Sequence, residues 1–161
     1  MSQIKVDSIV PSGGLPAGAT GGGIIQVVRA SSNTSNVNPS STSTWTDAGP
    51  SVTITPQSTS NLIMIESSVM CISNNNNYVA FRLLRGSTVI REWWGYVNVG
   101  SYTSFMGPGK HIDSPATTSA VTYKLQIYVT NAAGNFFFNY NGSTDNNPLR
   151  NAELYAMELS T

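Results

Sequence analysis

Alternation of apolar and polar residues is the dominant pattern along this chain. In residues 121–130, VTYKLQIYVT, apolar side chains occupy every second position, with Thr, Lys and Gln between them. A period of two predicts a half-buried β-strand, because successive side chains of a strand point to opposite faces. Residues 78–85, YVAFRLLR, repeat the pattern with Val79, Phe81 and Leu83 on one face. We therefore expect strands in both segments.

The same pattern predicts strands in five further segments: 51–56, 61–72, 87–99, 134–142 and 151–159. Stretches rich in Asn, Ser, Gly and Pro separate them, which is the composition of turns. Helix formers occur in 151–159, NAELYAMEL, but Tyr155, Met157 and Leu159 alternate, and a strand is predicted there too. Many short strands with regular turns indicate an all-β fold. We expect an antiparallel β-sandwich, a jelly roll of roughly eight strands, with an extended N-terminal arm.

The start of the chain has a different organisation from the rest. Residues 1–23 contain an alternating stretch, QIKVDSIV, followed by the Gly- and Pro-rich stretch PSGGLPAGATGGG. A lone strand is stable only when it pairs with another edge, which is how strand addition recognises a partner. We expect residues 1–23 to be a docking strand and tether, and residues 24–161 to be the sandwich domain. The expected docking residues are Ile4, Val6, Ile9 and Leu15.

Charge and cysteine usage exclude several classes of function. Charged residues make up 10% of the chain and the net charge is +0, so a basic nucleic-acid-binding face is not expected. The single cysteine, Cys71, cannot form an intrachain disulfide and is predicted to be buried. No secretory signal and no apolar run long enough to span a bilayer is evident, so no membrane partner is expected.

One segment contains the residue types of a hydrolytic triad. His111, Asp113 and Ser114 lie together in HIDS. Strand alternation would place Ser114 on the opposite face from the other two, whereas a triad must converge in space. We expect no catalysis and no cofactor. One His and one Cys cannot form a zinc site within one chain, although three copies of His111 around a threefold axis could.

Aromatic residues on both faces of a strand indicate contacts beyond a single subunit. Consecutive Trp93 and Trp94 must point to opposite faces, and 136–138, FFF, covers both faces as well. A ring that faces away from its own core meets a subunit, a loop or a sugar, and oligomer interfaces are rich in aromatic residues. The expected interface residues are Trp93, Trp94, Tyr96, Phe136, Phe137 and Phe138. Polar loops supply possible glycan contacts, which are Asn75, Asn76 and Asn146, although such loops are also ordinary solvated turns.

The chain also resembles a known group of proteins. Its opening, KVDSIVPSGGLPAGATGGGIIQVV, is similar to the starts of fibre and capsid-associated proteins of tailed phages that infect cyanobacteria and related bacteria. The later stretches SVTITPQSTSNLIMI, RLLRGSTVI and HIDSPATTSAVTYKLQIYV resemble the trimeric jelly-roll heads of such virion proteins. The resemblance covers both ends and most of the middle. It implies a virion protein, made in the host cytoplasm, that forms a homotrimer.

Three functions remain open after the resemblance. The first is a capsid decoration or cement protein, docked through its arm on the major capsid protein or another virion protein. The second is a short head or tail fibre that binds a host glycan. The third is a polysaccharide hydrolase. The first is favoured because no shaft of repeats or heptads separates the arm from the domain.

Overall fold

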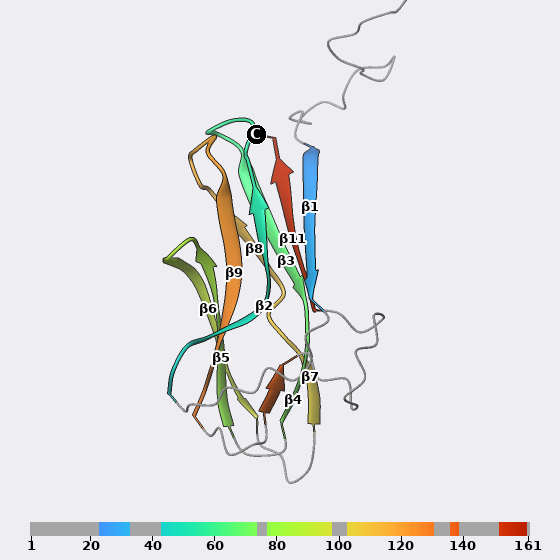
Figure 1. The fold of residues 1–161 in the computed structure, drawn as a ribbon, viewed down its shortest axis with the longest axis vertical. Coiled ribbons are helices and arrows are strands. Elements are labelled where there is room, and N and C mark those ends of the chain that lie inside the picture. Colours follow the sequence, from blue (N-terminus) through green and yellow to red (C-terminus); the bar gives the residue numbers. More distant parts are fainter. Residues whose placement is uncertain are drawn as a thin grey trace, which may run out of the picture.

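The chain folds as two antiparallel sheets of four strands each (Figure 1). The computed structural model describes residues 23–32, 43–73, 77–97, 103–130, 136–138 and 152–160, and all regular structure within these ranges is β-strand. The first sheet has the order β1 (Ile24–Ser32), β11 (Ala152–Leu159), β3 (Leu62–Ser68) and β8 (Lys110–Asp113). The second has the order β2 (Thr46–Ile54), β9 (Val121–Val129), β5 (Asn77–Arg85) and β6 (Thr88–Val97). The predicted all-β sandwich is confirmed.

The strand order is that of a jelly roll. Counted along the chain, the eight strands of the two large sheets place the first, eighth, third and sixth in one sheet. The second, seventh, fourth and fifth form the other. This arrangement is two interlocked Greek keys, the double-sheet solution that buries one face of each sheet against the other. The start of β1 lies beside the end of β11, where the Ser160 N–H donates to the Gly23 carbonyl at 2.9 Å.

A small third sheet continues the first one. It has the order β10 (Phe136–Phe138), β4 (Met70–Ser73) and β7 (Thr103–Met106). β4 follows β3 after Val69, and β7 precedes β8 by three residues. The Gly107 N–H donates to the Val69 carbonyl at 2.8 Å. This bond joins the break between β3 and β4 to the break between β7 and β8. A Cβ at Gly107 would approach the Val69 Cβ to 3.3 Å, so the close contact favours glycine.

The core lies between the two large sheets and contains the faces predicted for two strands. Val79, Phe81 and Leu83 of β5 are buried, and so is the alternate set on β9 that includes Tyr123 and Ile127. In β11 the buried face is the set that includes Leu154, not the Tyr155 set whose alternation predicted the strand. β11 is flanked by strands on both sides and carries apolar residues on both faces, so its sequence alone does not determine which face is internal.

The turn between β5 and β6 positions the aromatic residues of β6. Gly86 and Ser87 form a two-residue connection, with Arg85 paired to Thr88. Gly86 has φ +59°, and glycine with positive φ at the first turn position is typical of tight hairpins. The hairpin places Trp93 opposite Phe81, on the inner face, and Trp94 opposite Ala80, on the outer face. The prediction that the two tryptophans point to opposite faces is therefore confirmed.

Two carboxylates hold the ends of the sandwich together. Asp113 of β8 accepts hydrogen bonds from the Arg85 guanidinium at 2.9 Å and from the Tyr123 hydroxyl at 2.7 Å, which links the two sheets. Burial, followed by the bond to Asp113, raises the pKa of Tyr123.

Glu158, which has no exposed surface, accepts bonds at 2.7 Å from the Gln57 N–H and the Asn61 amide, and a third from Gln26.

The bonds to Glu158 tie β11 to β1 and to the turn between β2 and β3. Burial raises the pKa of the Glu158 carboxyl, but the hydrogen bonds outweigh this effect and hold the pKa below its usual range. A buried carboxylate is stable only with such partners. Glu158 therefore serves a structural purpose.

Candidate functional site

Five aromatic side chains gather on the outer face of the sheet β2-β9-β5-β6. Strand register brings them together: Tyr128 of β9 pairs with Ala80 of β5, which pairs with Trp94 of β6. Tyr78 and Tyr96 form the next aromatic pair along β5 and β6. Trp45 lies directly before β2 and contacts Tyr128 and Trp94. We call this cluster the aromatic face, and its members are Trp45, Tyr78, Trp94, Tyr96 and Tyr128.

The rings of the aromatic face pack against one another and stay accessible. Tyr128 lies 5.3 Å from Trp45 and 5.6 Å from Trp94, measured between ring centroids, and the two tryptophans are 6.1 Å apart in an edge-to-face arrangement. These are the separations at which aromatic pairs attract. Ala80, in register between Tyr128 and Trp94, has no exposed surface, although it is on the outer face. Trp94 remains 60% exposed, so the cluster is held in place and open to solvent.

A strip of polar side chains borders the aromatic face. The Arg82 guanidinium lies 4.4 Å from the centre of the Trp45 ring and donates through Nε to Gln126 at 2.7 Å. Gln126 in turn donates to Asp47, and Lys124 donates to the same carboxylate at 2.8 Å. Hydrogen bonds from Lys124 and then Gln126 hold the pKa of Asp47 below its usual value. The strip, which we call the polar strip, therefore stays charged at neutral pH with donors and acceptors side by side.

The outer face of the other sheet has a different chemistry. Val27, Met157, Met64 and Ile112 pair in register and form one continuous row across all four strands. A second row, at the end of the sheet, contains Ile24, Leu159 and Leu62. Val27 is 56% exposed and Ile112 is 52% exposed. We call these seven residues the aliphatic face, and it confirms that the stretch NLIMI is apolar on both sides.

Charges on the outer face of this sheet lie at its other end, and they are paired. Arg29 of β1 forms an ion pair with Glu153 of β11, and Glu153 also accepts a hydrogen bond from the Tyr155 hydroxyl at 2.6 Å. Lys110 of β8 lies 3.4 Å from Glu66 of β3. The bonds from Tyr155 and then Arg29 hold the pKa of Glu153 below its usual value. The aliphatic face is thus bordered by a neutral set of charges.

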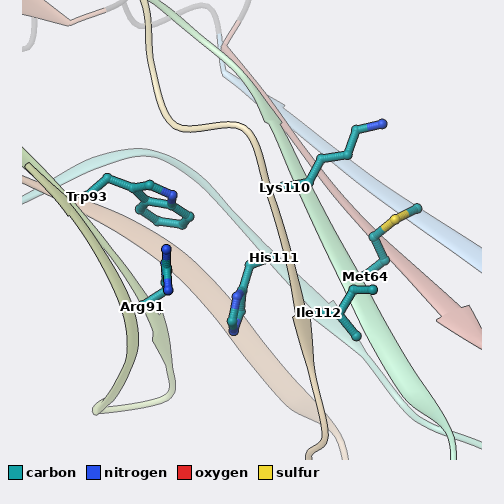
Figure 2. Close-up of a pocket in the computed structure, with 6 residues that line it drawn as sticks. All are labelled: Met64, Arg91, Trp93, Lys110, His111 and Ile112. Carbon is teal, nitrogen blue, oxygen red and sulfur yellow. The ribbon is translucent and has the colours of Figure 1, made fainter.

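A shallow depression of about 460 Å³ opens at the edge of the sandwich between β6 and β8 (Figure 2). Arg91 and Trp93 of β6 lie on one side, and His111 of β8 lies across from them. The Arg91 guanidinium lies 5.9 Å from the Trp93 ring centre. The remaining lining residues are Met64, Lys110 and Ile112. Among the lining residues that the structure describes, none carries a carboxylate or a hydroxyl group.

The HIDS segment does not assemble a triad among the described residues. Asp113 is engaged by Arg85 and Tyr123, and Ser114 lies exposed after β8, with its carbonyl accepting a bond from Arg85. His111 lies two residues away along the strand and lines the depression described above. In the part of the chain that the structure describes, no group of three His, Cys, Asp or Glu side chains could hold a metal ion. The same part contains no helix long and apolar enough to cross a membrane.

Cys71 is buried in the core, as its apolar surroundings in the sequence predicted. Its thiol has no exposed surface, and burial raises its pKa. A thiol of this kind is unreactive at neutral pH, because the thiolate is the nucleophilic form.

Three of the predicted interface residues lie on β6 and are divided between its two sides. Trp94 and Tyr96 belong to the aromatic face, whereas Trp93 packs against the core. The strand β10 contains Phe136, Phe137 and Phe138, but the positions of their side chains lie outside what the structure describes. Residues outside the described ranges include the docking set Ile4, Val6, Ile9 and Leu15 and the possible glycan contacts Asn75, Asn76 and Asn146.

Sequence reasoning missed three members of the aromatic face. These are Trp45, Tyr78 and Tyr128, and the sequence carries a signal for two of them. Tyr128 interrupts the polar face of an alternating strand, and Trp45 is the large apolar residue in a Ser- and Thr-rich stretch. Their convergence depends on the register of four strands, which no single segment encodes.

Comparison with known proteins adds no assignment to this picture. No protein-family description matches the chain, and no curated protein matches it. The function is therefore inferred from the surfaces described above and from the resemblance, which covers both ends and most of the middle of the chain.

Proposed function

We propose that this chain is a structural protein of a tailed-phage virion that docks on the capsid as a homotrimeric decoration protein. The observation that carries the proposal is the aliphatic face. A sheet with one face in water normally alternates apolar inside and polar outside, whereas β1-β11-β3-β8 has aliphatic rows on its outer side. Apolar patches of this kind mark protein interfaces.

The chemistry of the aliphatic face suits a second copy of the same chain. Its members are Val, Ile, Leu and Met, which make well-packed apolar contacts and need no hydrogen-bond partner. The charges that border it are two cations and two anions already paired with each other. Burying the face therefore leaves no ion without a partner. Threefold symmetry is the part of the proposal that comes from the resemblance, because burial alone is equally compatible with a dimer.

The N-terminal arm supplies the docking element in this proposal. It joins the domain at Gly23, where β1 begins, and β1 is the edge strand of the sheet that bears the aliphatic face. A virion partner paired with the alternating stretch QIKVDSIV would therefore be tethered next to the subunit interface.

Deleting residues 1–23 tests the docking role. We expect the truncated protein to remain soluble and folded and to lose its incorporation into particles, because the pairing strand is absent. Circular dichroism checks the fold, and a stained gel of purified particles measures incorporation. A matched control replaces Lys5 and Asp7, which alternate with Ile4 and Val6 in the sequence, with Ser. Normal incorporation of the truncated protein would contradict the proposal.

A short fibre that binds a host glycan is the second candidate, and the aromatic face favours it. Copy number per virion separates the two roles. Hundreds of copies per particle would support decoration, and a few tens or fewer would support a fibre. The ratio of this protein to the coat protein on a stained gel of purified particles gives that number.

A further inference from the structure

The aromatic face and the aliphatic face differ in the chemistry of their exposed side chains, and this difference indicates that they bind different kinds of ligand. Among the described residues, the exposed large apolar side chains of the aromatic face are Tyr and Trp, whereas exposed aliphatic ones lie on the sheet β1-β11-β3-β8 and, as Met70, on β4. Val89, 40% exposed, is the exception on β6 and lies at its far end from Trp94. An interface for another protein subunit would not need aromatic and aliphatic side chains to lie on separate faces. Rings with polar edges suit a ligand that is itself amphipathic.

We propose that the aromatic face binds a neutral oligosaccharide, with Trp94 and Tyr96 as stacking platforms for adjacent sugar rings. The C–H bonds on one side of a hexose carry partial positive charge, and the face of an aromatic ring is electron-rich. Trp94 and Tyr96 lie two residues apart on one strand, so their backbone positions are separated by about 6.6–6.8 Å, which is on the scale of one sugar residue. The proposal rests on the glycan-binding role given above as the second candidate and deepens it by naming the stacking residues and the ligand class, and it does not depend on trimer assembly.

The platform is fixed before a ligand arrives. The indole N–H of Trp94 donates to Glu92 at 3.2 Å, and its ring packs on Tyr128 and Trp45. The Tyr78 and Tyr96 rings lie 4.7 Å apart, which fixes the second platform. Because these side chains are already ordered, binding would cost little conformational entropy. Such preorganisation matters most for sugars, whose individual contacts are weak.

The polar strip has the charge and the groups that a neutral sugar needs. Arg82, Lys124 and Asp47 of the strip, together with Glu92 of β6, which pairs with Arg82 in register, contribute two positive and two negative charges. Gln126 offers both a donor and an acceptor. Sugar hydroxyls donate and accept hydrogen bonds, so a mixed strip matches them. Nucleic-acid bases also stack on aromatic rings, but their phosphates require a basic surface, which this balanced strip does not provide.

Titration of the full-length protein with defined oligosaccharides tests the proposal. The probes are cellohexaose, β-1,4-linked galactohexaose and maltohexaose, with a dT hexanucleotide as the comparison. Tryptophan fluorescence and calorimetry report binding. We expect at least one saccharide to bind with a Kd below about 10 mM and the oligonucleotide not to bind. Failure of all three saccharides, or tighter binding of the oligonucleotide, would overturn the proposal.

Substitutions locate the site and keep the test independent of folding. Trp94→Ala and, separately, Tyr96→Ala are each expected to weaken saccharide binding at least tenfold. Tyr155→Ala, which removes a ring from the opposite sheet, is the matched control and should leave affinity unchanged. Thermal melts check that each variant is folded. If both platform variants bind normally, or if they change the mass of the assembly in solution, the aromatic face is not a sugar site.

Discussion

Glu158 shows how one residue can be essential to a fold without belonging to a site. Its carboxylate is fully buried and is held by the Gln57 N–H, the Asn61 amide and Gln26. Hydrogen bonds to a charged group contribute about 1.5–3 kcal/mol each. Without the carboxylate, the donors that it accepts from would lose their charged acceptor. Nothing in the alternation of β11 distinguishes Glu158 from a solvent-facing acid, because its partners come from distant segments.

We expect Glu158→Gln to lower the free energy of unfolding by about 2–3 kcal/mol at pH 7. Chemical denaturation at a fixed protein concentration measures the change. Glu66→Gln, which removes a half-exposed carboxylate beside Lys110, is the matched control and should cost less than about 1 kcal/mol. Equal losses for the two variants would contradict the structural role of Glu158.

The same residue predicts how stability depends on pH. The folded state holds the pKa of Glu158 below its usual value of about 4.3, so the unfolded chain takes up the proton first as pH falls. The contribution of Glu158 is therefore fully present above about pH 4.3 and is lost as pH falls through the lower, folded-state pKa. We expect the stability gap between wild type and Glu158→Gln to narrow from pH 6 to pH 3. A constant gap would contradict this.

At the scale of elements, strands were predictable where one side is buried and the other is polar. Residues 121–129 and 78–85 follow a strict period of two, and the structure confirms both the strands and their buried faces. Irregularities were not predictable. β2 has a register shift between Ala48 and Ser51, next to Gly49 with φ +79°, and this depends on how β2 pairs with β9. The position of Trp45 beside Tyr128 depends on the same pairing.

The β5–β6 hairpin gives a prediction at this scale. Gly86 has a positive φ, which side chains with a Cβ rarely adopt, while a Cβ there would meet no atom within 4 Å. Gly86→Ala should therefore destabilise the protein by about 1 kcal/mol through backbone strain alone. Gly109→Ala, where a Cβ also meets nothing and φ is not positive, should have little effect. Thermal unfolding of both variants distinguishes backbone strain from packing. Equal losses of stability in the two variants would contradict the attribution of the Gly86 effect to its positive φ.

At the scale of the molecule, the sandwich has two outer faces of different chemistry. The aliphatic face is expected to be covered by copies of the chain, and the aromatic face is expected to stay open. The sequence indicated that apolar residues exceed what one subunit can bury, from stretches such as NLIMI and EWWGY. It could not assign them to separate faces, because that requires knowing which strands are neighbours. The strand order supplied this information by aligning Val27, Met157 and Met64.

A substitution in the middle of the aliphatic face tests its role. Met157 lies between Val27 and Met64, so Met157→Lys would place a charge at the centre of the proposed interface. Burying that charge without a partner is unfavourable, and we expect the assembly to dissociate into smaller species. Val89→Lys introduces the same charge at an exposed position on the other sheet and should leave the assembly intact. Circular dichroism verifies that both variants remain folded.

The mass of the isolated full-length protein in solution is the most direct test of the central claim. Native mass spectrometry, or light scattering at micromolar concentration, measures it. The account predicts a homotrimer that Met157→Lys disrupts and Val89→Lys does not. A dimer disrupted by the same substitution would contradict the threefold symmetry while keeping the aliphatic face as the interface. A stable, well-folded monomer would contradict the account.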